Sequence, residues 1–505
     1  MTQTVTKKNH PWIAGLAVVA LLVFSYIFNE KPDLNGDNCY YYANATSLAH
    51  GDGYSDMFGN PTTNFPPGYP LLMTPLRLLT SSIVAQKVLN LIFLFVAVVL
   101  LFDILVRNGY KRSLAFATGV TVLVTPHILE FSTMMMSEAS CICSLALIAW
   151  LYMRLPDDEA AFWRTPCFYL LLLSLVFVYY IRTQALAVVG AVVVAFLFER
   201  RLRASLATVV AFVIGMLPWI VRNEILGLNQ SRYVSQIDFS NIAANIKMLI
   251  VQAIPESIFP FVNVSYNDTP GAFLWAFAVI WFLLIIYGFW RMGRLRWPLI
   301  IYLLGTIAII SIINTPSRYR YMTTALPFLT AGLFVGIYSL AERYAKHKKT
   351  VLLPWTLLGL LCVALLVQKG DDTKHTIWGL HKQAKMEYPA NFRNYFILGK
   401  QLYRYDKNAI VATRKPELLY VNSGIRGKHF LETNDQAKLV EDLIKKNIDF
   451  VVLEQLGFLA TYRYLLPCVE QNPEFFKPVA NIPNPDTYLI YFDRKKAQEW
   501  LDRRK

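Results

Sequence analysis

The feature that most constrains this chain is a series of long apolar runs in its first three quarters. A helix that crosses a bilayer needs about 20 mostly apolar residues, and runs close to that length recur until Gln368. Only 16% of the residues are charged, against roughly 25% in soluble domains. We therefore predict an α-helical polytopic membrane protein with about eleven transmembrane helices. The predicted spans are residues 11–28, 83–106, 113–130, 139–153, 165–181, 183–198, 204–221, 271–290, 297–313, 320–340 and 351–368.

The first apolar run, from Trp12 to Phe28, follows Lys7 and Lys8. It is either a cleaved signal peptide or an uncleaved first helix. No small-residue cleavage site follows the run, which favours an uncleaved helix.

The basic residues, which give the chain a formal charge of +15, lie mostly between the apolar runs. The positive-inside rule explains this distribution. Nucleic-acid binding needs a basic face on a soluble fold, so we expect no nucleic-acid partner. With the N-terminus in the cytoplasm, the cytoplasmic loops are rich in Lys and Arg, whereas the long outer loop 29–82 holds only Lys31 and Arg77. An odd number of spans then puts residues 370–505 outside the cytoplasm.

The tail after the last apolar run changes character. An amphipathic helix is expected at 391–405 and a second helix at 435–446, with short strands at 409–413, 450–453 and 488–492. This alternation indicates a small α/β domain, in which we find no catalytic motif. We therefore predict a transmembrane domain over residues 1–369 and an extracytoplasmic α/β domain over 370–505.

The 29–82 loop is the first candidate for a functional segment. Loops of this length in compact proteins are usually functional or disordered, and the aromatic residues of this loop argue against disorder. Asp37 precedes Tyr40, Tyr41 and Tyr42 at the start of an expected short helix along the membrane surface. In that position the carboxylate is either an N-cap or a functional acid. His50 belongs to a Gly- and Asp-containing turn that follows.

Three further polar groups fall on the same predicted outer face. Glu138 lies at the outer end of the fourth span, where a negative charge also favours a helix start. Arginines follow the seventh span and precede the tenth, and each is either a headgroup anchor or a ligand-binding group. These groups are Ser137-Glu138, Arg222-Asn223-Glu224 and Pro316-Ser317-Arg318-Tyr319-Arg320-Tyr321.

Acidic and arginine side chains on one face are suited to one kind of reaction, the transfer of a group linked to phosphate. A carboxylate can take a proton from an acceptor hydroxyl or hold a divalent metal. Arginine pairs bidentately with phosphate and does not lose its proton. Such a site is suited to binding a phosphate-linked sugar and moving the sugar to an acceptor, with the phosphate as leaving group.

At these residues the chain resembles the glycosyltransferase-C superfamily, in the branch of the protein O-mannosyltransferases and lipid A aminoarabinose transferases. The resemblance covers roughly residues 10–340 and depends on the order and shared side of the motifs. They are Asp37, Phe65-Pro66-Pro67-Gly68-Tyr69-Pro70, Glu138, Leu217-Pro218-Trp219-Ile220-Val221-Arg222-Asn223, and Arg318-Tyr319 with Pro327.

The resemblance implies an inverting transferase that uses a polyprenyl-phosphate sugar donor. Asp37 would be the general base or orient the acceptor, and Glu138 would lie near the acceptor or a metal. Asp37 and Glu138 are also the candidate ligands for a divalent metal, whose requirement stays open. The donor phosphate would be held by Arg318 or Arg320, with Arg222 as a further candidate, and Tyr319, Tyr69, Tyr41 and His50 complete the expected substrate-binding set.

One motif departs from this branch. The aminoarabinose transferases carry Glu-Lys before Pro-Pro, where this chain has Asn64-Phe65. The departure puts phosphate binding and metal binding by this loop in doubt. Lys87, at the outer start of the second span, is either a substitute for the missing lysine or a boundary anchor.

We therefore expect a glycosyltransferase in the lipid bilayer of a bacterial inner membrane, acting on a protein, lipid or glycan acceptor. One alternative is a surface polysaccharide ligase or polymerase, whose long loop would come late in the chain. A second is a transporter or flippase of lipid-linked sugars, for which inverted repeats would be typical. A third is a scaffold for the C-terminal domain. The sequence does not specify the sugar, the acceptor, the lipid length or the oligomeric state.

Overall fold

The computed structural model describes residues 2–34, 36–228, 237–258, 271–313, 318–344, 350–368 and 376–504; for residues 2–8, 318 and 319 it describes only the backbone. The chain forms two compact units. The first contains residues 1–30, 63–76 and 82–385, and the second contains residues 31–62, 77–81 and 386–505. The predicted boundary between residues 369 and 370 falls outside the described residues and stays a prediction.

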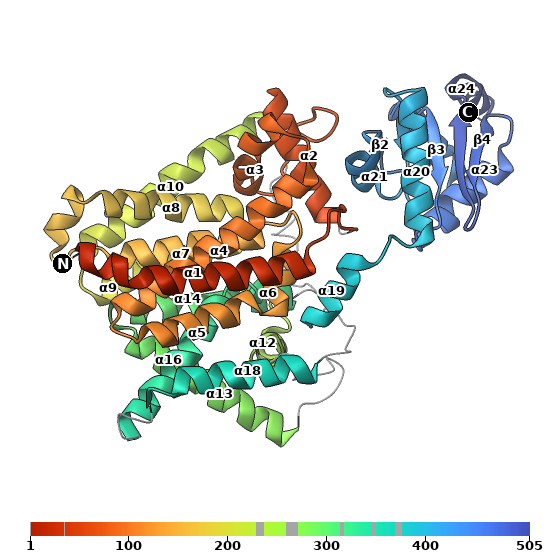
Figure 1. Cartoon of the computed structure of the whole chain (residues 1–505). Coiled ribbons are helices and arrows are strands. Elements are labelled where there is room, and N and C mark those ends of the chain that lie inside the picture. The colour runs from red at the N-terminus through yellow and green to blue at the C-terminus, as the bar shows by residue number, and fades with distance from the viewer. Residues whose placement is uncertain are drawn as a thin grey trace. The chain divides into compact units, whose positions relative to one another are not determined.

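The first unit consists of helices, several of which run alongside one another, such as α1, α4 and α5 (Figure 1). Long apolar side chains face outwards from these helices, as expected where lipid is the solvent. The α-helices that lie wholly in this unit are α1 (Thr2–Ile27), α4 (Ile83–Arg107), α5 (Arg112–Leu123), α6 (Pro126–Ser132), α7 (Glu138–Met153), α8 (Pro166–Ile181), α9 (Leu186–Phe198), α10 (Leu202–Ile225), α11 (Ile242–Met248), α12 (Ile254–Ile258), α13 (Ala272–Arg291), α14 (Arg296–Ser311), α15 (Arg318–Met322), α16 (Leu326–Tyr344), α18 (Leu353–Val367) and α19 (Ile377–Lys385).

Each predicted span coincides with helix in the described residues, but the count of about eleven is not confirmed. Within those residues, 5 helices are long and apolar enough to cross a membrane, or up to 6 if one bent pair is a single span. The bent pair is α5 and α6, which the sequence presented as one span over 113–130 and which meet at 59°. Extended backbone at Thr125 and Pro126 at the first helical position separate the two helices.

The second unit contains a five-stranded sheet of order β2-β1-β3-β5-β4. Strands β1 (Ile410–Ala412), β2 (Arg426–Lys428) and β3 (Phe450–Leu453) are parallel, and β4 (Phe476–Ile482) and β5 (Thr487–Phe492) complete it antiparallel. Helices α22 (Gln436–Lys445), α23 (Leu466–Gln471) and α24 (Arg494–Asp502) contribute to one core of the sheet, and α20 (Ala390–Tyr405) and α21 (Pro416–Ser423) to the other. The predicted small α/β domain is confirmed.

The first loop supplies α2 (Gly36–His50), with Asp37 in its first turn, so the predicted helix is confirmed. Helix α2 belongs to the second unit, and its Cys39 is buried in the core cluster that includes Leu418 and Leu419 of α21. Helix α3 (Gly68–Leu79) follows and extends from the first unit into the second.

Candidate functional site

The first unit contains a buried cluster of one carboxylate and two guanidinium groups. Glu138, at the start of α7, is completely buried. Its Oε1 lies 2.8 Å from Nη1 of Arg182 and 2.7 Å from Nε of Arg320. Arg182 also donates to Oγ of Ser137 at 3.0 Å. The cluster therefore brings two guanidinium groups together around one carboxylate, and guanidinium groups are suited to binding anions such as phosphate.

Each member of this cluster comes from a different segment. Arg182 ends α8, where its extended backbone (φ −150°) separates α8 from the next helical turn. Arg320 lies in α15, which is tied to the α8–α9 connection because Gln184 donates to the carbonyl of Tyr321 at 3.2 Å and to Oγ1 of Thr324 at 3.1 Å. The guanidinium positions therefore depend on packing between segments far apart in the sequence.

The Pro-Pro-Gly-Tyr motif supports two of these segments. Gly68 lies so close to the backbone of α8 that a Cβ there would be 2.5 Å from the carbonyl carbon of Tyr180, next to Ile181 and Arg182. The hydroxyl of Tyr69, which is completely buried, donates to Oδ1 of Asn90 at 3.0 Å. Asn90 in turn donates to the carbonyl of Met136 at 2.9 Å.

Met136 is two residues before Glu138. The Pro-Pro-Gly-Tyr motif therefore supports the chain next to Arg182 and the chain next to Glu138. Tyr69, expected to bind substrate, thus has its hydroxyl in a buried structural network.

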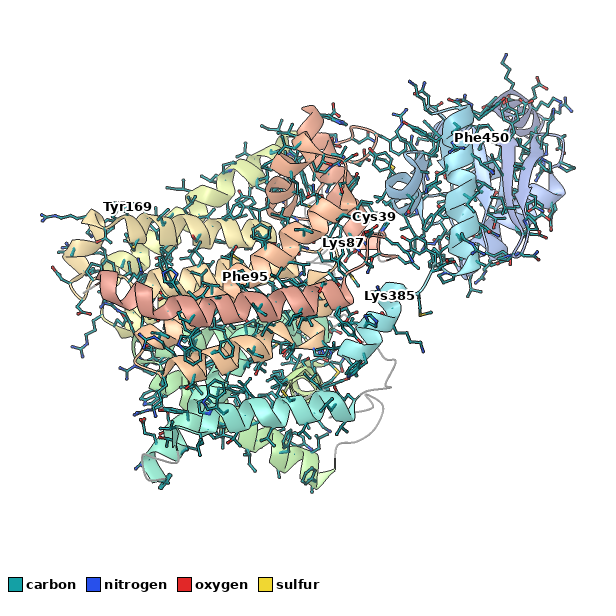
Figure 2. The ribbon with its side chains drawn as sticks, viewed as in Figure 1. Cys39, Lys87, Phe95, Tyr169, Lys385 and Phe450 are labelled. Atoms are coloured by element: carbon teal, nitrogen blue, oxygen red, sulfur yellow. The ribbon has the colours of Figure 1, made fainter. Side chains whose placement is uncertain are left out.

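Lys87, labelled in Figure 2, is completely buried near the start of α4. Its Nζ donates to Oδ1 of Asn29 at 2.8 Å. An anchor that reaches into the headgroups would be exposed. The structure therefore favours an internal role for this lysine over a boundary anchor.

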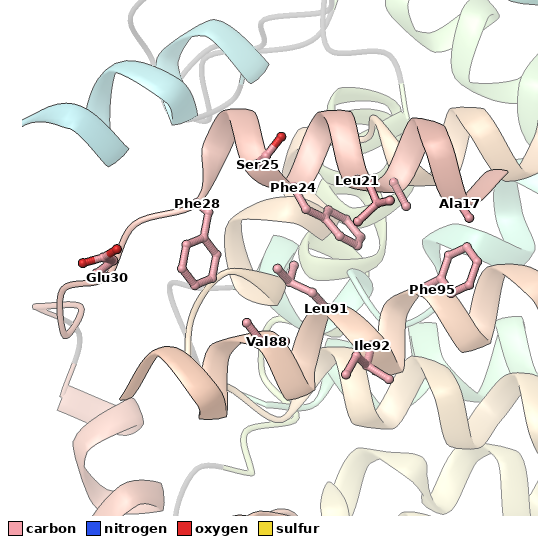
Figure 3. Close-up of a pocket in the computed structure, with 11 residues that line it drawn as sticks. Ala17, Leu21, Phe24, Ser25, Phe28, Glu30, Val88, Leu91, Ile92 and Phe95 are labelled. Carbon is pink, nitrogen blue, oxygen red and sulfur yellow. The ribbon is translucent and has the colours of Figure 1, made fainter. Parts of the chain in front are cut away.

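An apolar groove of about 610 Å³ lies between α1 and α4. Figure 3 shows Leu21 and Phe24 of α1 opposite Leu91 of α4, with Phe95 at one end and Glu30 at the other. Its lining is suited to a hydrocarbon chain, because it is apolar except near Ser25 and Glu30.

In the second unit, α2 carries several of the other predicted residues. Asp37 is half-buried, Tyr41 is buried and His50, the last residue of the helix, is exposed. Tyr42 donates to the carbonyl of Ser81 at 2.8 Å. The guanidinium of Arg77 lies 4.2 Å from the centre of the Tyr42 ring. These contacts fix α2 through Tyr42.

The structure describes three further predicted residues, Arg222, Arg318 and Tyr319, to different extents. Arg222 donates to Oδ1 of Asn223 at 2.7 Å and lies over the ring of Trp219. The backbones of Arg318 and Tyr319 begin α15, and their side chains lie outside the described part of the chain.

Oε1 of Glu138 contacts two guanidinium groups, whereas its Oε2 is buried without a hydrogen-bond partner among the described residues. No group of three or more His, Cys, Asp or Glu side chains within the described ranges is arranged to hold a metal ion. We therefore derive no step that uses a metal.

Sequence reasoning did not select Arg182 or Gly68 as functional. The signal for Arg182 was present, since it interrupts two apolar runs with almost no loop. An arginine in such a place needs a buried partner. Gly68 belongs to the Pro-Pro-Gly-Tyr motif but was given no role of its own, and no sequence signal marks Asn90, whose role depends on long-range packing.

The fold matches that of known membrane glycosyltransferases. ArnT from Cupriavidus metallidurans bound to undecaprenyl phosphate aligns with a TM-score of 0.64 and 13% identity, covering 95% of this chain and 98% of that one. Apo ArnT from the same organism aligns with a TM-score of 0.59 and 13% identity, covering 97% and 99%. The Archaeoglobus fulgidus oligosaccharyltransferase in complex with zinc and sulfate gives 0.51 and 12%, covering 95% and 73%.

No protein-family model matches the chain, and no curated protein sequence does. At this level of identity the likeness establishes the shared fold. ArnT and the oligosaccharyltransferase are both glycosyltransferase-C proteins, so the resemblance predicted from the sequence is confirmed at the level of the fold.

Proposed function

Because the chain has the glycosyltransferase-C fold, we propose that it transfers a sugar from a polyprenyl-phosphate donor to an acceptor outside the cytoplasm. The acceptor is a protein, lipid or glycan. The proposal includes about eleven spans, a cytoplasmic N-terminus, an extracytoplasmic C-terminal domain and a bacterial inner membrane.

The observation that carries the proposal is the buried cluster of Glu138, Arg182 and Arg320, which brings two guanidinium groups together. Arginine matches the geometry of phosphate oxygens, and a buried, pre-positioned guanidinium stabilises charge that develops on a leaving group. We assign the donor phosphate to Arg320 and Arg182. Glu138 then holds the arginines in place, and Arg318 and Arg222 remain further candidates.

In the proposed reaction Asp37 takes the proton of the acceptor hydroxyl. The acceptor oxygen forms a bond to the anomeric carbon of the sugar while the bond from that carbon to the phosphate oxygen breaks. The configuration inverts, and polyprenyl phosphate leaves as an anion stabilised by arginine. The apolar groove between α1 and α4 would accept a hydrocarbon chain of a lipid substrate.

The test uses the full chain in lipid nanodiscs with a panel of polyprenyl-phosphate sugars and a crude envelope extract as acceptor source. Free polyprenyl phosphate is quantified for the wild type, Asp37→Asn and Arg320→Met. A matched control is Arg107→Met, whose partner is Asp103 on the same helix.

We expect release by the wild type and by Arg107→Met. Asp37→Asn should lose turnover but keep donor binding, whereas Arg320→Met should bind the donor at least ten times more weakly. Equal donor affinity of Arg320→Met and the wild type would contradict the phosphate role. No release from any donor would favour the ligase or flippase alternatives.

A further inference from the structure

Within the second unit, the start of α2 lies against the carboxyl ends of the parallel strands. Helix α2 packs on α21, which follows β1 directly. A Cβ added to Gly36 would lie 3.9 Å from Nζ of Lys415. The ammonium group of Lys415 is therefore next to the residue that precedes Asp37.

Lys415 is held in this place by its surroundings. Tyr395, which is completely buried, donates from its hydroxyl to the Lys415 carbonyl at 3.0 Å. The ammonium group lies 4.9 Å from the centre of the Phe458 ring, where a cation–π interaction is favourable. Pro416 begins α21 and restricts the backbone at Lys415. A half-buried lysine on a fixed backbone is pre-positioned for a ligand.

The ionisable groups around Lys415 share one neighbourhood. Burial raises the pKa of the Cys39 thiol, and the charges of Glu417, Asp33, Lys415 and Asp37 all act on that thiol. These charged groups therefore lie close to one another around the start of α2.

Glu417 has donors of its own. Nε2 of His429 lies 3.2 Å from Oε1 of Glu417, and the Tyr40 hydroxyl also bonds to this carboxylate. Burial opposes ionisation of Glu417, but these donors hold its pKa below the ordinary value. The carboxylate is therefore ionised and bound by groups other than Lys415.

Lys415 lies just beyond the carboxyl end of β1, at a place where α/β domains bind ligands. The chain leaves β1 to form β2 on one side and returns to form β3 on the other, so the connections diverge at β1. Ligands of open α/β sheets bind outside the carboxyl ends of strands at such a point. Lys415 is the third residue after β1.

We propose that Lys415 binds an anionic group of the substrate, such as a phosphate, beside Asp37. This inference depends on the proposed role of Asp37. Lysine supplies a compact point charge that suits phosphate oxygens. The anionic group belongs either to the donor or to the acceptor, and the test distinguishes the two.

The test compares Lys415→Met and Lys415→Arg with the wild type in nanodiscs. Methionine keeps the length of the side chain without its charge, and arginine keeps the charge. The matched control is Lys477→Met, an exposed lysine on β4 at the opposite edge of the sheet. Two half-saturation values are measured from the release of polyprenyl phosphate. One is for the donor that the wild type uses, and the other is for the envelope extract.

We expect Lys415→Met to raise one half-saturation value at least tenfold, because a charged hydrogen bond is lost. Lys415→Arg should stay within about threefold of the wild type, and Lys477→Met should be unchanged. A rise for the donor assigns the anionic group to the donor, and a rise for the extract assigns it to the acceptor. Thermal unfolding of each variant checks that the fold is kept.

Unchanged half-saturation in Lys415→Met would overturn the inference, as would a fall in turnover alone or a failure of arginine to restore binding. Failure of the transferase proposal is seen separately, because the wild type would then release no polyprenyl phosphate. In that case undecaprenyl phosphate itself is the probe, and equal affinity for the wild type and Lys415→Met would overturn the anion site.

Discussion

At the level of single residues, Glu138 keeps Arg182 and Arg320 together although their charges repel each other. Replacing Glu138 by glutamine keeps the shape of the side chain and removes its charge. Breaking a buried ion pair on one side costs about 3–5 kcal/mol, because a buried charge is left uncompensated. We expect Glu138→Gln to lower the unfolding temperature in nanodiscs and to weaken undecaprenyl phosphate binding at least tenfold.

The control for this prediction is Asp103→Asn, which breaks the more exposed pair with Arg107. Exposed pairs contribute about 0–1 kcal/mol, so its effect should be small. Stability and lipid binding of Glu138→Gln equal to those of the wild type would contradict the structural role of this carboxylate.

Glu454, directly after β3, makes the stability of the second unit depend on pH. Burial raises its pKa to about 7, although Oγ1 of Thr461 donates to Oε1 at 2.6 Å. Because the folded pKa lies above the ordinary value of 4.5, the neutral form is favoured on folding. The neutral Glu454 carboxyl makes its full contribution to the free energy of unfolding below about pH 4.5. On the order of 3 kcal/mol of this free energy is lost as the pH rises through 7.

We therefore expect the wild type to unfold at a lower temperature at pH 8 than at pH 5. In Glu454→Gln the difference between the two pH values should be smaller, because glutamine stays neutral at both. Thermal unfolding of the full chain measures both values, and an identical pH dependence in the two proteins would contradict the assignment.

At the level of elements, Gly68 lets α3 approach the end of α8. A Cβ there would meet the backbone of Tyr180 and Ile181 at 2.5–2.7 Å, and backbone cannot rotate away as a side chain can. Gly68→Ala should therefore displace the end of α8 and with it Arg182. We expect the half-saturation value for the donor to rise at least tenfold.

The matched control is Gly190→Ala in α9, where a Cβ would have nothing within 4 Å. Alanine is the better helix former there by about 1 kcal/mol, so this variant should bind the donor normally. Normal donor binding by Gly68→Ala would show that the close approach does not position the arginine.

The elements that the sequence predicted are those with a strong local pattern. Run length alone predicted α4 and α7, and the sequence also predicted β3 and β5 as short strands. The sequence did not predict β2, whose three residues Arg-Gly-Lys carry no apolar pattern. It also missed β4, an edge strand with Pro478 and a register shift. Both lie at the edges of the sheet, where burial leaves little trace in the sequence.

For the candidate site, the sequence selected residue types but not their partners. Glu138 and Arg320 were chosen as separate groups, and the structure pairs them with Arg182. Lys415 was not chosen, because nothing near it in sequence resembles a motif. Its relation to Asp37 depends on a contact between parts of the chain that are hundreds of residues apart, which local patterns do not encode.

At the level of the whole molecule, residues 31–62 and 77–81 of the first loop form one compact unit with residues 386–505. Cys39 reports on this unit, because it is completely buried and burial raises its thiol pKa. The thiolate is the reactive species, so a water-soluble maleimide should leave Cys39 unmodified in the full chain. In a chain ending at Lys385 the same thiol should react.

Peptide mass spectrometry identifies the modified cysteine, and Cys39→Ser confirms the assignment. The buried Cys468 of the full chain serves as a second protected thiol. Rapid modification of Cys39 in the full chain would contradict the shared core of α2 and α21.

One compact unit combines residues 31–62 with residues 386–505. This combination has a consequence for biosynthesis. About 320 residues separate these segments, which at roughly 5–20 residues per second corresponds to about 15–65 s of translation. During that interval the early segment, with its tyrosines and Cys39, has been made while its partner has not. The face of α2 that is buried in the complete fold is thus a natural client for a chaperone, and premature termination of translation would leave that face permanently uncovered.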